Sequence, residues 1–98
     1  MNHARLGHVN KPVHWTAYAR GKLVFLREHG FDVPAHEVIR TVLEPDRVVH
    51  GHTSRRVAQR VLSDRHLLRV VYEESAHECL IITLYPARRS RYESTHDL

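Results

Sequence analysis

The apolar residues of this 98-residue chain change their spacing at Pro45, and this change restricts the fold more than any other feature. Before Pro45, apolar side chains recur every three or four residues, as on one face of an amphipathic helix. After Pro45 they form short runs in which apolar and polar residues alternate, as in strands that are buried on one face. The chain is therefore expected to form helices first and strands second, which is typical of an α+β domain.

Two helices are predicted before Pro45. The first spans residues 16–29, with Thr16 as its N-cap and Gly30 at the position where a glycine commonly ends a helix. The second begins at Pro34, because a missing N–H costs nothing in the first turn of a helix. Its apolar residues follow helical spacing and are Ala35, Val38, Ile39, Val42 and Leu43.

Four short strands are predicted after the second helix, at residues 47–50, 55–62, 66–72 and 78–85. Strands at intervals of about ten residues favour an antiparallel meander. The expected fold is thus α+β, with an N-terminal αα hairpin packed on a four-stranded antiparallel sheet. Residues 1–13 are expected to form an N-terminal arm and residues 14–98 a single domain.

The composition excludes several classes of protein. With 42% hydrophobic and 27% charged residues, the chain is neither fibrous nor of low complexity. No apolar run approaches the ~18 residues of a membrane span, and the N-terminus lacks the apolar segment of a secretory signal, so neither is expected. The single cysteine, Cys79, predicts a reducing, cytoplasmic location.

Charge indicates a polyanionic partner. Fifteen basic residues against eleven acidic ones give a net charge of +4 and a pI near 9.7, and a pI above ~9 is typical of nucleic-acid-binding domains. Side chains alternate across a strand, so each predicted strand offers a core face and an open face. The open face is predicted to carry Arg56, Ala58, Arg60, Leu67, Arg69, Val71, Cys79, Ile81, Thr83 and Tyr85. The core face is predicted to carry Val57, Gln59, Val61, Leu68, Val70, Tyr72, Leu80, Ile82 and Leu84.

Three more arginines and a tyrosine follow the last strand and are expected to join the arginines of the open face. Clustered arginines with neighbouring aromatic rings bind phosphates and stack bases. The predicted nucleic-acid-binding residues are Arg56, Arg60, Arg69, Tyr85, Arg88, Arg89 and Arg91. The alternative is that these arginines are ordinary solvated residues on a sheet with one open side.

The segments Arg69–Tyr72 and Leu80–Tyr92, with the junction 44–48, resemble the signature of a family of small bacterial domains of unknown function. The similarity extends over about residues 14–93, and the family is itself similar to the BrnT and RelE group of ribonuclease toxins. This resemblance implies cleavage of RNA, free or bound to a ribosome, without a metal or other cofactor, and an antitoxin protein as a partner. The site residues that it implies are Arg60, Arg69, Arg88 or Arg89, and Tyr92. Two positions depart from the related domains, which often carry His in place of Tyr18 and Arg in place of His29.

Cleavage by 2′-hydroxyl attack needs a proton acceptor, a proton donor and cations that stabilise the charge on the phosphoryl oxygens. His66 and Tyr92 are the nearest candidates for the proton transfers. The predicted catalytic residues are therefore Arg60, His66, Arg69, Arg88, Arg89 and Tyr92. His66 also alternates in step with the predicted core residues, so the alternative interpretation is that it caps the edge of the core.

Other sequence signals are weaker. His50 and His52 offer two imidazoles, but zinc sites need three or four ligands, so no metal site is predicted. Cys79 fits a small buried hydrophobic residue better than a nucleophile. Three functions therefore stay open: a metal-independent ribonuclease toxin, a nucleic-acid-binding module without turnover, and a protein-interaction domain. RNA and an antitoxin are the expected partners, and no membrane is expected.

Overall fold

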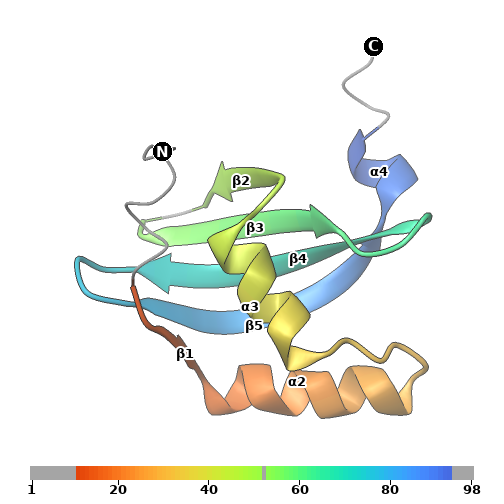
Figure 1. The fold of residues 1–98 in the computed structure, drawn as a ribbon, viewed down its shortest axis with the longest axis horizontal. Helices are drawn as coiled ribbons and strands as arrows, with labels where there is room; N and C mark the ends of the chain where they lie inside the picture. The colour runs from red at the N-terminus through yellow and green to blue at the C-terminus, as the bar shows by residue number, and fades with distance from the viewer. Residues whose placement is uncertain (1–10, 52, 94–98) are drawn as a thin grey trace.

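A single five-stranded sheet organises the protein, and its two long helices pack against one of its faces (Figure 1). The computed structural model describes residues 11–51 and 53–93, and the elements within these ranges keep the labels of Figure 1. In chain order they are β1 (Val13–Trp15), α2 (Ala17–Glu28), α3 (Ala35–Leu43), β2 (Arg47–His50), β3 (Arg55–Val61), β4 (His66–Glu74), β5 (Cys79–Arg88) and α4 (Arg89–Glu93).

The sheet has the order β1-β5-β4-β3-β2. Strands β2 to β5 form the predicted antiparallel meander, but β1 adds a fifth strand that runs parallel to β5. The α+β class is therefore confirmed, whereas the sheet is five-stranded and mixed rather than four-stranded and antiparallel. A strand of three residues is too short to show an alternating pattern in the sequence, which is why β1 was not predicted. Residues 1–10 of the predicted arm lie outside the described residues, whereas Val13, at its end, pairs with Cys79.

The two long helices begin and end where their local sequence signals indicate. The Thr16 side chain accepts a hydrogen bond from the Ala19 backbone N–H (3.0 Å) at the start of α2, and Gly30 adopts a left-handed conformation (φ 93°) just beyond its end. Pro34 precedes α3. Helix α2 packs mainly on β5, and α3 packs on β3 and β4, so each helix covers its own part of the sheet. The predicted αα hairpin is therefore not confirmed.

The main core lies between these helices and the sheet. Leu68, Val70 and Tyr72 of β4 face it as predicted, and so does Leu84 of β5. The rest of its fully buried set is Ala19, Leu26, Val33, Val38, Val42, Ala58, Cys79 and Ile81. In the described part of the chain, no helix is long and apolar enough to cross a membrane.

Strand β3, and the part of β5 that precedes its bulge, have the opposite face assignment from the predicted one. In β5, Cys79 and Ile81 are buried in the core because the register shifts: Val71 pairs with Thr83, whereas Tyr72 pairs with Ile81. One additional residue in β5 at this bulge reverses the alternation on either side of it. In β3, Ala58 pairs with Val70 and is fully buried, so the valines of β3 face away from the helices. The sequence-based assignment placed the two valines on the core face because their apolar side chains are larger than that of Ala58.

Burial of Cys79 makes stability sensitive to alkaline pH. Burial raises the pKa of the Cys79 thiol, and the nearby Glu74 carboxylate raises it further. The unfolded chain then loses the thiol proton first, so stability is fully present below ~pH 8.5 and decreases as the pH rises through the folded pKa. Burial raises the pKa of Tyr72 in the same way, with the same sign.

We expect the free energy of unfolding to stay constant from pH 7 to 8 and to fall from about pH 9 upward. Urea unfolding at a series of pH values measures this dependence. Cys79→Val should reduce the alkaline fall, and Tyr72→Phe should reduce it at higher pH, where a phenol ionises. An alkaline fall that is identical in wild type and Cys79→Val would contradict the assignment to the thiol.

Candidate functional site

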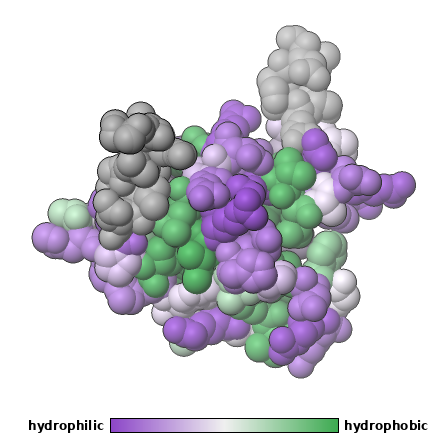
Figure 2. Space-filling view, in the orientation of Figure 1, coloured by the Kyte–Doolittle hydropathy of each residue, from purple (hydrophilic) through white to green (hydrophobic). Residues whose placement is uncertain are grey.

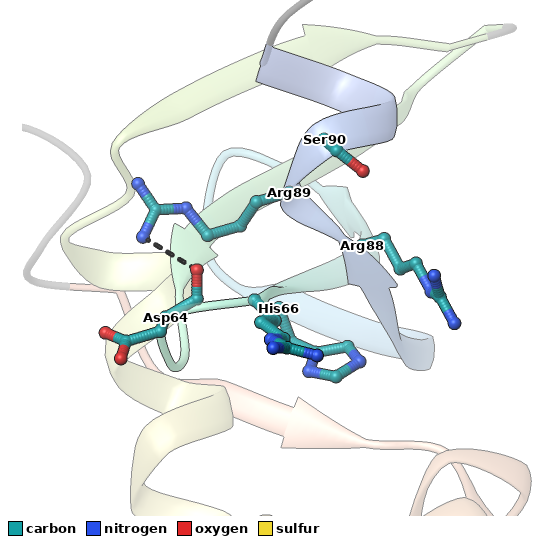
Figure 3. Close-up of a pocket in the computed structure, with 6 residues that line it drawn as sticks. Asp64, His66, Arg88, Arg89 and Ser90 are labelled. Atoms are coloured by element: carbon teal, nitrogen blue, oxygen red, sulfur yellow. Dashed lines mark hydrogen bonds between the residues drawn. The ribbon is translucent and has the colours of Figure 1, made fainter.

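A hollow of about 360 Å³ opens at the edge of the sheet where β4 begins and β5 ends (Figure 3). Its volume lies at the lower end of the range for small-molecule sites. Antiparallel pairing sets His66, the first residue of β4, opposite Arg88, the last residue of β5. The hollow is lined by Asp64, Arg65, His66, Arg88, Arg89 and Ser90. With His66 neutral, this lining has a net charge of +2.

The His66 side chain is placed by the loop between the two long helices. The ring of Phe31 meets the imidazole edge-on, with the ring centroids 5.0 Å apart and the planes at 82°. Phe31 is fixed in turn, because its backbone N–H donates to the Leu26 carbonyl (2.8 Å) after the left-handed turn at Gly30. His66 therefore lies on the helix-covered face, at the edge of the core, as its alternation predicts. Its position on the rim of the hollow also leaves the predicted catalytic role open.

Three arginines line the hollow together with His66: Arg65 of the β3–β4 hairpin, Arg88 at the end of β5 and Arg89 at the start of α4. The Arg88 side chain is exposed and makes no hydrogen bond or ion pair within residues 11–51 and 53–93. The Arg89 backbone N–H donates to the Arg65 carbonyl (2.8 Å), and Arg89 Nη1 donates to the Asp64 carbonyl (3.4 Å). These bonds hold the start of α4 against the β3–β4 hairpin. Figure 3 shows Arg88 and Arg89 extending to opposite sides of this helix start, with His66 between them.

A second cluster lies on the open face of the sheet, around Arg69. Arg69 Nε donates to Tyr85 Oη (3.0 Å), and Arg69 Nη1 donates to Gln59 Oε1 (2.5 Å). The guanidinium carbon lies 4.2 Å from the centre of the Tyr92 ring, a close cation–π contact that holds α4 over the sheet. All these partners are neutral, and no carboxylate lies within ion-pair distance of Arg69 among the residues that the structure places. The charge of Arg69 is therefore not neutralised within the described fold.

A second hollow of about 510 Å³ adjoins this cluster. It is lined by Tyr85, Pro86, Ala87, Arg88, Ser90, Arg91 and Tyr92. Arg88 and Ser90 line both hollows, so the two adjoin around the first turn of α4. The end of the sheet thus offers a continuous basic surface with two tyrosines on one side and His66 on the other.

The structure divides the predicted binding residues into two groups. Arg69, Tyr85, Arg88, Arg89, Arg91 and Tyr92 gather at the end of the sheet, with His66. Arg56 and Arg60 instead belong to the helix-covered face of β3, because Ala58 between them is in the core. Arg60 Nη1 donates to the Glu44 carbonyl at the end of α3 (2.9 Å). Arg56 Nε lies 3.9 Å from Glu74 Oε1, within ion-pair distance. The prediction that Arg56 and Arg60 share a face with Arg69 is therefore wrong.

Three residues of the site were not predicted from the sequence. Arg65 and Asp64 were assigned only to a hairpin, and Gln59 was assigned to the core face beside two valines. The predicted meander could have indicated Asp64 and Arg65. Because β5 runs antiparallel to β4, the end of β5 lies beside the β3–β4 hairpin. Within the ranges that the structure describes, no three His, Cys, Asp or Glu side chains are grouped to hold a metal ion. His52, one of the paired imidazoles, lies outside the described residues.

Comparisons of the chain with models of protein families, with curated proteins and with solved structures find no match. Its function is therefore inferred from the geometry and chemistry of the residues at the end of the sheet.

Proposed function

We propose that this protein is a metal-independent endoribonuclease of the toxin type that cleaves single-stranded RNA at the hollow around His66. One observation carries the proposal: antiparallel pairing and the start of α4 bring an imidazole together with Arg65, Arg88 and Arg89 around a single opening. Imidazole is the side chain whose charge most readily changes between pH 5 and 8, and guanidinium groups bind phosphate through paired hydrogen bonds.

The reaction uses these groups in defined roles. His66 accepts the proton of the ribose 2′-hydroxyl while the 2′-oxygen forms a bond to the adjacent phosphorus. The bond from phosphorus to the 5′-oxygen breaks, and a proton from His66 or from water neutralises that leaving oxygen. The products are a 2′,3′-cyclic phosphate and a free 5′-hydroxyl. The arginines stabilise the negative charge that develops on the phosphoryl oxygens during the transfer.

The neighbouring hollow supports binding of a second nucleotide. Arg91 and the shared Arg88 offer charge to the next phosphate, and Tyr85 and Tyr92 offer rings beside it. Unpaired bases stack on such rings, whereas the bases of a duplex are already stacked on one another, which favours single-stranded RNA. The resemblance to BrnT and RelE toxins adds an antitoxin partner to this proposal, and the single cysteine, Cys79, adds a cytoplasmic location.

The test is incubation of end-labelled RNA with purified protein in EDTA. Cleavage that yields 2′,3′-cyclic phosphate ends, on free RNA or on translating ribosomes, would support the proposal. RNA that is bound in a salt-dependent manner but stays intact would replace it with a binding module, which the uncompensated Arg69 beside Tyr92 also favours. Protein that neither cuts nor binds RNA at low salt would leave a protein-interaction domain.

His66→Ala tests the role of the imidazole. We expect the cleavage rate to fall by about 10²–10⁴-fold, the usual contribution of general acid–base catalysis, while the affinity for RNA stays within about twofold. Single-turnover kinetics and filter binding measure the two quantities separately. The matched control is His36→Ala, an exposed histidine on α3 that does not line the hollow and should leave both unchanged. Equal rates for wild type and His66→Ala would exclude His66 as the acid–base group.

A further inference from the structure

A row of polar side chains crosses the open face of the sheet from strand to strand. The register places Arg47 of β2 opposite Gln59 of β3. It places Arg69 of β4 opposite Gln59 and also opposite Tyr85 of β5. Directly opposite residues project from the same face of a sheet, so the four side chains lie side by side. Because neighbouring strands are about 4.8 Å apart, this polar row extends over about 14 Å.

The polar row offers hydrogen-bond donors that the fold does not use. Arg47 is exposed, and its side chain makes no hydrogen bond or ion pair with any residue that the structure describes. Gln59 is only 5% exposed, and its Oε1 accepts from Arg69, whereas its Nε2 has no partner. No fully buried side-chain nitrogen or oxygen is unpaired in the described ranges, so Nε2 belongs to the small exposed part of Gln59. Arg69 Nη2 also has no partner there.

No carboxylate neutralises the polar row. Glu73 is the only acidic residue that β2 to β5 place on the open face, and it pairs with Arg55 (3.0 Å). Asp46 precedes Arg47 in the sequence, but its carboxylate accepts from the Val61 backbone N–H (2.9 Å) and lies beyond ion-pair distance of Arg47. The cross-strand neighbours on either side of the row are uncharged and are Val49, Val57, Val71 and Thr83 on one side and Val61, Leu67 and Ala87 on the other. The row therefore carries a net charge of +2, which suits a polyanion.

The position of the polar row favours a nucleic-acid strand over an acidic peptide. Tyr85, at one end, also lines the hollow of about 510 Å³, and Arg47, at the other end, lies on the edge strand β2. Figure 1 places β2 along the upper edge of the sheet, and Figure 2 shows hydrophilic side chains there. An extended peptide commonly binds through free backbone groups at the edge of a sheet. The polar row instead consists of side chains, and β3 and β4 are already paired on both sides.

We propose that the polar row binds the phosphates of RNA nucleotides that lie outside the hollow around His66. The strand passes the hollow lined by Tyr85 and crosses β4 and β3 towards β2. Tyr92 covers one face of the Arg69 guanidinium (4.2 Å), so a phosphate meets the free Nη2 in the plane of that group. A further phosphate binds Arg47 at the edge of the sheet. This inference rests on the proposed function for the identity of the strand as RNA.

The test measures the affinity of the whole protein for a single-stranded RNA of about ten nucleotides. Its riboses are 2′-O-methylated, so it lacks the attacking hydroxyl and stays intact. The logarithm of the association constant should fall linearly with the logarithm of salt concentration, by about 0.7 for each phosphate contacted. Arg47→Ala should weaken binding by about three- to tenfold at about 50 mM salt and should lower this slope by about 0.7. The effect should be the same for RNAs of different sequence, since phosphates carry no base information.

Arg27→Ala is the matched control, because Arg27 is an exposed arginine of α2 without an ion pair in the described part of the chain. It removes the same charge and should change neither the affinity nor the slope. Arg47→Ala that binds like wild type, or that loses no more affinity than Arg27→Ala, would overturn the proposal. A polyglutamate peptide that binds more tightly than the RNA, and loses this affinity in Arg47→Ala, would assign the row to an acidic protein instead.

Unmodified RNA separates this inference from the ribonuclease proposal. A phosphate contact outside the reacting bond is equally strong before and during cleavage, so Arg47→Ala should raise KM by the same three- to tenfold and leave kcat unchanged. Binding that depends on Arg47 without any cleavage would refute the ribonuclease and leave the polar row as an RNA site. Cleavage with equal KM in wild type and Arg47→Ala would keep the ribonuclease and refute the row.

Discussion

Replacing Arg88 and Arg89 together by alanine is expected to lower the rate of RNA cleavage by about 10⁴-fold without unfolding the protein. Removing one donor that stabilises transition-state charge costs about 10²–10³-fold, and here two of the three cations of the hollow are lost. The fold should persist, because the Arg88 side chain has no described partner. The 2.8 Å bond from Arg89 to Arg65 is made by the backbone and remains when the longer, exposed side-chain bond to the Asp64 carbonyl (3.4 Å) is lost. Single-turnover kinetics measures the rate, and circular dichroism with thermal unfolding checks the fold.

Two further variants separate charge from position. Arg20→Ala with Arg27→Ala removes the same charge from the exposed surface of α2, and this control should retain the wild-type cleavage rate. Arg88→Lys with Arg89→Lys keeps the charge but loses the paired donors of guanidinium, so we expect a partial loss of about 10²-fold. A double alanine variant that cuts RNA at the wild-type rate would show that the active site lies elsewhere.

The helices of this fold were predictable because their limits depend on local chemistry. Thr16 caps α2 through its own side chain, Gly30 supplies the left-handed turn beyond it, and Pro45 stops α3. Each of these effects involves residues within a few positions of each other. The sequence therefore placed both helices to within one or two residues of their observed limits.

The faces of the strands were only partly predictable, because they depend on pairing between distant residues. In β4 the sequence pattern and the structure agree on Leu68, Val70 and Tyr72. In β3 the apolar pattern alone did not distinguish Ala58 from the valines on either side. The correct assignment follows only from the pairing of Ala58 with Val70, which is not encoded in the local pattern of β3.

The same distinction explains which site residues were found. Arg88 is the last residue of β5 and Arg89 follows it directly, so their place at the end of the sheet depends only on where β5 ends. Arg69 and Tyr92 were expected near one another, and their contact of 4.2 Å agrees with that expectation. Arg60 was assigned to the wrong face of the sheet because every residue of β3 was. Arg65 was overlooked because a hairpin residue becomes part of a site only once the neighbouring strand is known.

Comparison of Ile81→Ala with Ile82→Ala tests the bulge that determines the face of β5. Ile81 is fully buried, and its truncation is expected to lower the free energy of unfolding by about 2–5 kcal/mol. Total stabilities of about 5–15 kcal/mol are usual for single domains, so this loss is a large fraction of the whole. Ile82 is only partly buried, and its truncation should cost about 1 kcal/mol. Urea unfolding at pH 7 measures both variants, with the slope of the transition checked for constancy.

The two isoleucines are adjacent and chemically identical, so strand propensity and the lost apolar volume cancel in the comparison. Only the face on which each side chain lies distinguishes them. Simple alternation through Leu84 places Ile82 in the core and predicts the reverse order of losses. A larger loss for Ile82→Ala would therefore show that β5 runs without the bulge, and that Cys79 and Ile81 face away from the helices. The observed register, in which Tyr72 pairs with Ile81, requires the larger loss at Ile81.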